Sequence, residues 1–164
     1  VRIKSEFTNE ELAGIALGRA ENVAYSAEIL ANIMNQQELG DYKTLRGDSA
    51  ERALLFYTEF ANPLKKVYTW DKSRENSLEA FTGGQVAMVI GKEADKKKFS
   101  QVNFALSPFP KIDINQPDSS WPVLSSKEVI VLRDVIELTA SGKSTALGAL
   151  YQGSKQLEEI ETSN

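Results

Sequence analysis

The chain has 164 residues, of which 41% are hydrophobic and 26% are charged, and this is enough material for one domain with a real core. Its formal net charge of −4 argues against a nucleic-acid partner held through phosphate neutralisation, and no apolar run approaches membrane-spanning length. Cysteine and histidine are both absent, which excludes Ser-His-Asp and Cys-His catalysis, thiol redox chemistry and the usual zinc ligand sets. Acid–base catalysis by paired carboxylates or by lysine stays open.

The first third of the chain predicts one strand and two helices. Residues 13–18 are a small, apolar run closed by a glycine, which is typical of a first buried strand. Asn22 is placed to cap a helix with an apolar face, and this pattern ends at Gly40. Asp48 opens a second helix whose apolar residues recur at intervals of three and four, and Asn62 with the following proline ends it.

The stretch 77–91 predicts a helix, a stop and a strand in close succession. Asn76 or Ser77 caps a short helix, and two adjacent glycines tolerate the left-handed backbone that closes it. Val86–Ile90 is a continuous apolar run, which favours a strand covered on both faces. Gly91 then lets the chain leave the strand in a place where open α/β sheets commonly contact ligands.

The rest of the chain predicts another strand and two further helices. The mixed charges of Lys92–Lys98 are typical of a solvated helical turn, and Val102–Leu106 is a second strand candidate that leads into prolines. Ser126 starts an amphipathic helix that ends before Gly142, and Ser144 caps the last helix.

Two motifs that suggest chemistry have simpler structural interpretations. Residues 142–145 (Gly-Lys-Ser-Thr) look like the end of a phosphate-binding loop, but Glu137 stands where that pattern needs a glycine, and a helix precedes it instead of a strand. We therefore interpret them as a helix stop followed by a helix cap. The acid pairs Glu10-Glu11 and Glu158-Glu159 lack an apolar pocket in the sequence around them, so we interpret them as solubilising surface groups.

Tyr68 and Trp70 are two large aromatic residues in the loop before the helix at residue 77. Such rings stack on a sugar or another apolar ligand face at little cost in entropy, or they pack in a core. The second role is the more common one for an aromatic residue, and both interpretations stay open at this point.

Several segments of the sequence together suggest a protein family. They are residues 13–18, 53–61, 68–70, 77–91 and 102–110. In this order they resemble the extracellular solute-binding proteins of ABC importers, of the maltose-binding-like family 1, and mainly the second lobe of those proteins. The resemblance covers Ala13 to about Lys111, and the helices from Val129 to Ile160 are similar to that family's carboxyl-terminal ending.

The resemblance implies an α/β fold, a periplasmic-binding-protein type II lobe with a short central sheet flanked by helices. Residues 1–164 would form a single lobe of the carboxyl-terminal type, with another lobe and an export signal expected before residue 1. The family's passage after residue 110 is longer than the one in this chain. Either the protein is a shortened relative, or the chain has been cut or joined between about 111 and 128. In the second case Trp121 would lie beside an artificial junction and would not be a site residue.

The resemblance also implies a function. It predicts non-enzymatic, extracytoplasmic binding of a solute, with a sugar or oligosaccharide as the first guess, and delivery to the permease subunits of an ABC importer after closure of two lobes. No cofactor, metal or nucleic acid is expected, and membrane attachment would be through a lipid anchor outside this chain. The expected ligand-binding residues are Arg19, Glu21 and Asn22 after the first strand, Gly91, Lys92 and Glu93 after the central strand, and, by their chemistry, Tyr68 and Trp70.

Two other classes of function stay open. One is a glycoside hydrolase of the carboxylate type, which would use two acidic residues. The other is an interaction domain that binds no small ligand.

Overall fold

A computed structural model of the chain describes residues 3–4, 11–36, 42–111 and 121–162 and shows a mixed α/β fold that is mostly helical. In chain order the described elements are β1 (Ile3–Lys4), β2 (Glu11–Ile15), α1 (Ser26–Asn35), α2 (Asp48–Glu59), α3 (Ser77–Thr82), β3 (Val86–Met88), the 3₁₀ helix η1 (Glu93–Phe99), α4 (Ser126–Ala140) and α5 (Ala146–Thr162).

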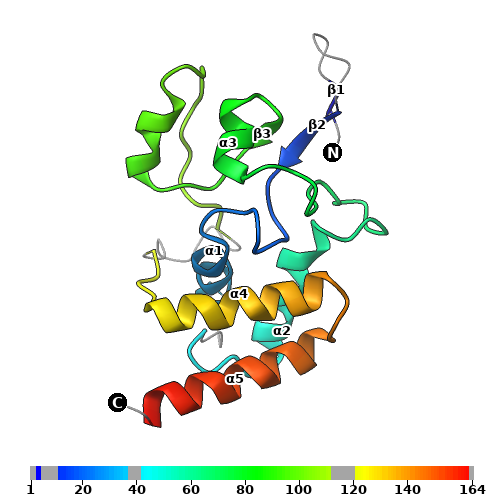
Figure 1. Ribbon diagram of the computed structural model, residues 1–164, viewed down its shortest axis with the longest axis vertical. Coiled ribbons are helices and arrows are strands. Elements are labelled where there is room, and N and C mark those ends of the chain that lie inside the picture. The colour runs from blue at the N-terminus through cyan, green and yellow to red at the C-terminus, as the bar shows by residue number, and fades with distance from the viewer. Residues whose placement is uncertain (1–2, 5–10, 37–41, 112–120, 163–164) are drawn as a thin grey trace.

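The sheet is small and lies at one end of the molecule (Figure 1). The strand order is β1-β2-β3, with β1 antiparallel to β2, and β2 parallel to β3. Ala13 pairs with Val86 and Ile15 pairs with Met88 in the parallel ladder. Among the described helices, α3 packs beside β3, whereas α1, α2, α4 and α5 pack chiefly on one another. The α/β class is therefore confirmed, but the described sheet is short and lies at one end of the molecule, with α3 packed beside β3.

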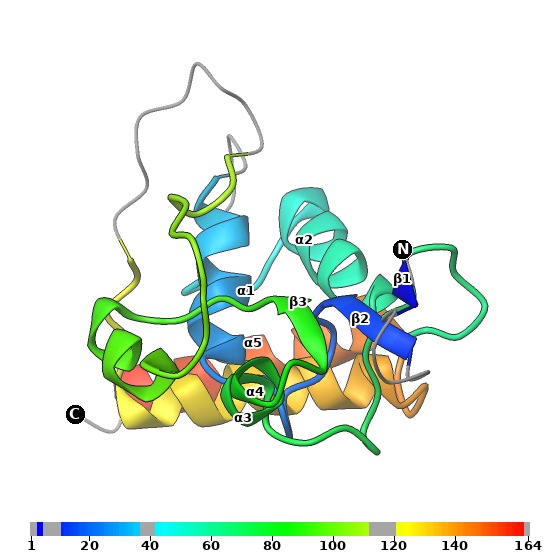
Figure 2. The ribbon, with the colours of Figure 1, turned by 90° about the horizontal axis from the view of Figure 1, so that it is seen from above.

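The core lies in the helical body, where α4 packs against α1, α2 and α5 (Figures 1 and 2). Leu30 and Met34 of α1, Leu54 of α2, and Leu132 and Ile136 of α4 are all fully buried there. Burial of one such side chain stabilises a fold by roughly 1.5–3 kcal/mol, so this shared core fixes the positions of the four helices.

Local capping explains where two of the helices begin. The Asn76 side chain accepts a hydrogen bond of 3.0 Å from the amide of Leu78, which starts α3. At α4, Ser125 and Glu128 form a capping box, in which the Ser125 hydroxyl accepts from the Glu128 amide at 3.2 Å and the Glu128 carboxylate accepts from the Ser125 amide at 2.7 Å. Both predicted helix starts are confirmed to within a residue, as is the start of α2 at Asp48.

The region around the first strand differs from the prediction. The strand predicted at residues 13–18 starts earlier, at Glu11, and ends at Ile15, because the chain turns through Gly18 with a φ of 102°. Helix α1 starts only at Ser26, after Tyr25 in the left-handed conformation, so Asn22 does not cap it. The predicted helix end at Gly40 lies outside the described residues.

The predicted strands of the second half are also shorter than expected. β3 covers only Val86–Met88. Val86 is 2% exposed, but Ala87, which points to the opposite face, is exposed, so the strand is not covered on both faces. Val102–Leu106 is not a strand, because none of the described strands pairs with it, and it leads instead through an irregular segment to the prolines. The conformation of this segment was therefore decided by tertiary context.

The connection between α4 and α5 confirms the structural interpretation of residues 142–145, with one correction. Gly142 has a φ of 70°, and the Ser144 amide donates to the Leu138 carbonyl at 3.0 Å, which closes α4. The hydroxyl that caps α5 belongs to Thr145 and not to Ser144, because it accepts from the amide of Gly148 at 3.1 Å.

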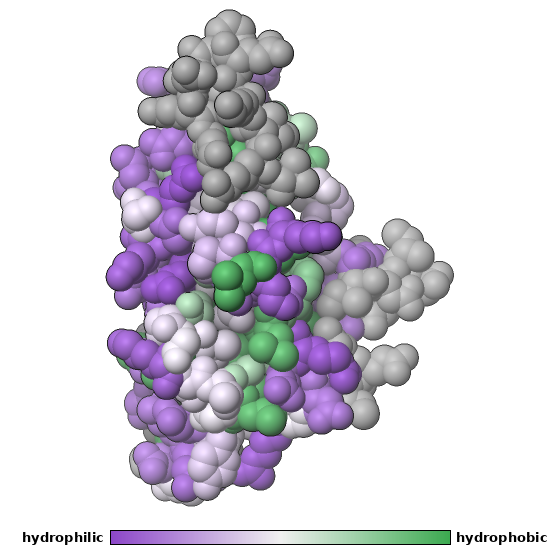
Figure 3. All heavy atoms as spheres, turned by 90° about the vertical axis from the view of Figure 1, so that its right-hand side faces the viewer, coloured by the Kyte–Doolittle hydropathy of each residue, from purple (hydrophilic) through white to green (hydrophobic). Residues whose placement is uncertain are grey.

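Exposed apolar side chains occur on several elements. They include Leu55 and Phe56 of α2, Leu64 in the loop that follows, and Leu147 and Tyr151 of α5. Figure 3 shows green hydrophobic groups on one side of the molecule with purple hydrophilic groups between and around them. None of the helices in the described parts of the chain is long and apolar enough to cross a membrane.

Candidate functional site

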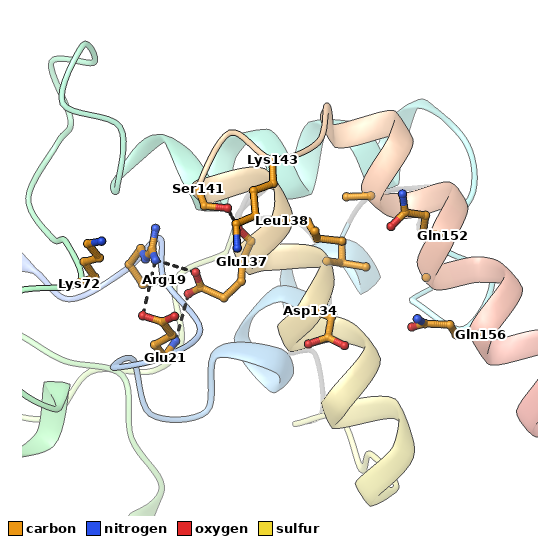
Figure 4. A pocket seen from close by; sticks show the side chains of 13 residues that line it. Arg19, Glu21, Lys72, Asp134, Glu137, Leu138, Ser141, Lys143, Gln152 and Gln156 are labelled. Atoms are coloured by element: carbon orange, nitrogen blue, oxygen red, sulfur yellow. Dashed lines mark hydrogen bonds and ion pairs between the residues drawn. The ribbon is translucent and has the colours of Figure 1, made fainter.

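A polar groove of about 400 Å³ lies between the loop after β2, the second half of α4, and α5 (Figure 4). Its polar lining includes Arg19 and Glu21 from the β2–α1 loop, Glu137 from α4, Lys143 from the α4–α5 connection, and Gln152 and Gln156 from α5. Two of the residues that the sequence predicted as ligand contacts, Arg19 and Glu21, therefore lie together in it.

An ion pair between Arg19 and Glu137 holds one wall of the groove. The Arg19 Nη2 atom lies 2.6 Å from Glu137 Oε2, and the Arg19 side chain is only 10% exposed. The other carboxylate oxygen, Oε1, accepts hydrogen bonds from the amides of Ala20 at 2.7 Å and Glu21 at 3.1 Å. Charge-assisted hydrogen bonds of this kind are short and strong, so Glu137 fixes the β2–α1 loop on α4.

The same loop is held from its other side by α2. The Tyr57 hydroxyl donates to the Arg19 carbonyl oxygen at 3.0 Å, and burial of the Tyr57 ring raises the pKa of this hydroxyl above its ordinary value. Tyr57 therefore stays a neutral donor. A Cβ atom at Gly18 would lie 2.5 Å from the backbone nitrogen of Ala61, so only glycine allows the loop to pass so close to the end of α2.

The remaining lining suits hydrogen bonding to a polar solute. Asp134, Gln152 and Gln156 are exposed carboxylate and amide groups, and Leu138 adds a partly buried apolar surface beside them. Glu137, in contrast, already has both oxygens engaged, one by two amide hydrogen bonds and the other by the ion pair with Arg19. Among the described residues no group of three or more acidic, histidine or cysteine side chains is placed to hold a metal ion.

Asn22 and Tyr68 brace the loop that carries Lys72 to the groove. The Asn22 amide donates to the carbonyl oxygens of Asp71 at 2.8 Å and Arg74 at 2.9 Å. The Tyr68 hydroxyl donates to the Asp71 carboxylate at 2.5 Å, and hydrogen bonds from Ser73 and then from Tyr68 lower the pKa of Asp71. Neither Asn22 nor Tyr68 lines the groove.

Trp70 belongs to the core. Its side chain has 0% of its surface exposed, so it has no face for a solute, and of the two interpretations of this residue the structure supports packing. The burial follows from the backbone, because the amides of Thr69 and Trp70 both donate to the Phe60 carbonyl and draw the loop onto the end of α2.

Gly91, Lys92 and Glu93 lie apart from the other predicted contacts, and none of the three lines the groove. The Lys92 ammonium lies 4.5 Å above the ring of Tyr25 and 3.5 Å from the Glu28 carboxylate of α1. Glu93 pairs with Lys96 at 2.8 Å on the exposed side of η1. The loops after β2 and β3 therefore do not bring their predicted contacts to a single site.

Asp95 forms hydrogen bonds with several groups of the segment after β3. It is 3% exposed, and it accepts hydrogen bonds from the Lys92 amide at 2.9 Å and the Lys98 ammonium at 2.8 Å. Burial alone would raise the pKa of Asp95, but hydrogen bonds from Lys98, the Lys92 amide and Tyr25 outweigh it and lower this pKa. Burial and the hydrogen bond to Asp95 raise the pKa of Tyr25 from 10.0 to about 12.

Several groove residues were not predicted from the sequence, above all Glu137, Asp134 and Lys143. Glu137 follows the buried residues Val135 and Ile136, and a carboxylate beside the apolar stripe of a helix was the available sign that it has a partner. Nothing in the spacing of the chain indicates that this partner is Arg19.

Comparisons of the chain with protein-family models, with curated protein sequences and with solved structures find no match.

Proposed function

We propose that this chain is a non-enzymatic solute-binding lobe of an ABC importer and that it binds a carbohydrate in the groove beside Arg19 and Glu137. The observation that carries the proposal is the Arg19–Glu137 ion pair, with its two amide hydrogen bonds to the same carboxylate. It gives a polar groove one rigid wall before any ligand arrives. The resemblance of the chain's segments to the importer family supports the transport role.

The chemistry of the open groove fits a sugar. Gln152, Gln156 and Asp134 offer amide donors and carbonyl or carboxylate acceptors, which are the groups that hydroxyl-rich ligands need. Leu138 offers an apolar surface for the C–H face of a pyranose ring. Because the Arg19 wall is already ordered, binding loses less conformational entropy than it would on a mobile loop.

In this proposal the solute also links the lobe to transport. A second lobe closes over the bound sugar, and contacts made only in the closed form shift the open–closed equilibrium by their differential affinity. The closed form is then recognised by the permease subunits. The proposed setting is the cell surface or periplasm, with a lipid anchor outside residues 1–164.

A thermal-shift panel of neutral and acidic mono- and oligosaccharides tests the proposal. A sugar present at about 100 times its Kd is expected to stabilise the folded chain by about 2.7 kcal/mol and to raise its Tm. The double variant Gln152→Ala and Gln156→Ala should lose the shift, while Gln101→Ala, an exposed glutamine outside the groove, should keep it.

Two results would contradict the proposal. Release of product from an oligosaccharide by the wild-type chain would favour a hydrolase instead, and assays for new reducing ends would detect it. A complete absence of shifts across the panel would favour an interaction domain without a small ligand.

A further inference from the structure

Positive side chains gather at one end of the groove. Figure 4 shows Lys72 on one side of Arg19 and Lys143 on the other. Both lysines are exposed, and neither forms an ion pair with a described residue. This end of the groove therefore offers two uncommitted ammonium groups, although the whole chain carries a net charge of −4.

The carboxylates of the groove differ in how strongly other groups of the chain bind them. Both oxygens of Glu137 are engaged, one by Arg19 and the other by two amides. Glu21 lies 3.6 Å from Arg19 Nη2 with its side chain 62% exposed, and an exposed pair at this distance is weak. Asp134 lies away from the lysines, on the side of Gln156 (Figure 4). Glu21 is thus the carboxylate that a ligand can most easily replace.

Arg19 keeps an unused donor. Its Nε atom is buried and has no hydrogen-bond partner among the described residues. The residue as a whole is 8% exposed. A buried donor without a partner costs free energy, and it is uncommon enough to need an explanation. Arginine binds a carboxylate best through two parallel N–H groups. In Arg19 the Nε group has no partner among the described residues, and Nη2, which lies 2.6 Å from Glu137, is also 3.6 Å from the Glu21 carboxylate.

We infer that the groove selects a carbohydrate that carries a carboxylate, of the uronic-acid class, and that Glu21 occupies the place of that carboxylate in the unliganded chain. This inference rests on the proposed function and names its substrate class. The ligand carboxylate displaces Glu21, takes hydrogen bonds from Arg19 and faces the ammonium groups of Lys72 and Lys143. The sugar hydroxyls then lie toward Gln152 and Gln156.

Calorimetric titration with D-glucuronate, D-glucose and D-glucose 6-phosphate tests this assignment at low salt. Wild type should bind glucuronate about tenfold more tightly than glucose, because the carboxylate gains hydrogen bonds from Arg19 and electrostatic attraction to the two lysine ammonium groups. Lys72→Gln and Lys143→Gln should each weaken glucuronate binding by about threefold and weaken glucose binding by a smaller factor. Glu21→Gln should strengthen glucuronate binding, and Lys66→Gln, an exposed lysine outside the groove, serves as the matched control.

The outcomes separate this inference from the proposed function. Equal affinities for glucose and glucuronate, insensitive to Lys72 and Lys143, would overturn the inference and leave sugar binding intact. Tighter binding of glucose 6-phosphate than of glucuronate would overturn the carboxylate assignment. If the wider sugar panel also fails to bind, both the inference and the proposed function fall.

Discussion

At the scale of single residues, the Glu137 side chain holds the site together through more contacts than any other side chain that is described there. It neutralises a nearly buried arginine, and it also fixes two backbone amides of a loop that comes from the other end of the chain. A buried charge that loses its partner is far more costly than an exposed one, because desolvation is no longer offset. The site therefore depends on a contact that also supports the fold.

Glu137→Ala is expected to lower the free energy of unfolding by about 2 kcal/mol or more, since it leaves Arg19 unpaired and two amides without an acceptor. Urea denaturation followed by circular dichroism measures the loss. Lys127→Ala, an exposed change in the same helix, should stay within about 0.5 kcal/mol of wild type. Equal effects of the two substitutions would show that the ion pair does not stabilise the loop.

Tyr25 predicts a pH dependence of stability. Its folded pKa of about 12 exceeds its ordinary value of 10.0, chiefly because of burial and then because of the hydrogen bond to Asp95. The folded state therefore holds the phenolic proton more tightly, and this contribution is complete below pH 10 and lost as the pH rises through about 12.

The advantage of wild type over Tyr25→Phe should accordingly be smaller at pH 11 than at pH 9, where the urea midpoints of both proteins can be compared. A gap of the same size at both pH values would contradict the raised pKa. Glu28, Asp95 and Lys92 also face this hydroxyl or its ring, but all three are unchanged in the comparison.

At the scale of elements, the loop between β2 and α1 positions the site more than any helix does. It passes α2 at Gly18, donates two amides to α4 just afterwards, and reaches the left-handed Tyr25 before α1 begins. The tight passage at Gly18 sets where Arg19 enters the groove.

Gly18→Ala should destabilise the chain by about 3 kcal/mol or more, because a positive φ and a contact of 2.5 Å with the Ala61 nitrogen act together. Gly84→Ala is the matched control, since Gly84 also has a positive φ but a Cβ atom there meets nothing within 4 Å. The control should lose only about 1 kcal/mol in thermal or urea unfolding. A Gly18→Ala variant no less stable than the control would contradict the close passage.

At this scale the sequence could predict the features that depend on residues close together in the chain. The caps at Asn76 and Ser125 act within one turn of helix, and so α3 and α4 were found almost where they occur. Strand pairing depends on neighbours elsewhere in the chain, and Val102–Leu106 has the composition of a strand but pairs with none of the strands in the described residues. The Arg19–Glu137 contact joins distant segments for the same reason, so only its Arg19 half was predicted.

At the scale of the whole molecule, the helical body and the small sheet have different roles. Helices α1, α2, α4 and α5 build the core, and α4 and α5 also form two sides of the groove. The predicted contacts after β3 lie elsewhere, beside Tyr25 and Asp95. In the proposed two-lobe arrangement, the groove and not the β3 exit is the surface that receives the solute.

The most direct test of solute binding in the groove is a ¹⁵N–¹H NMR titration of the chain with D-glucose and D-glucuronate. We predict saturable shifts of the backbone amides of Ala20, Glu21 and Lys143, with the amide of Lys92 unchanged. Saturable shifts at Lys92 and its neighbours, with the three groove amides unmoved, would contradict the account, as would the absence of any saturable shift with either sugar.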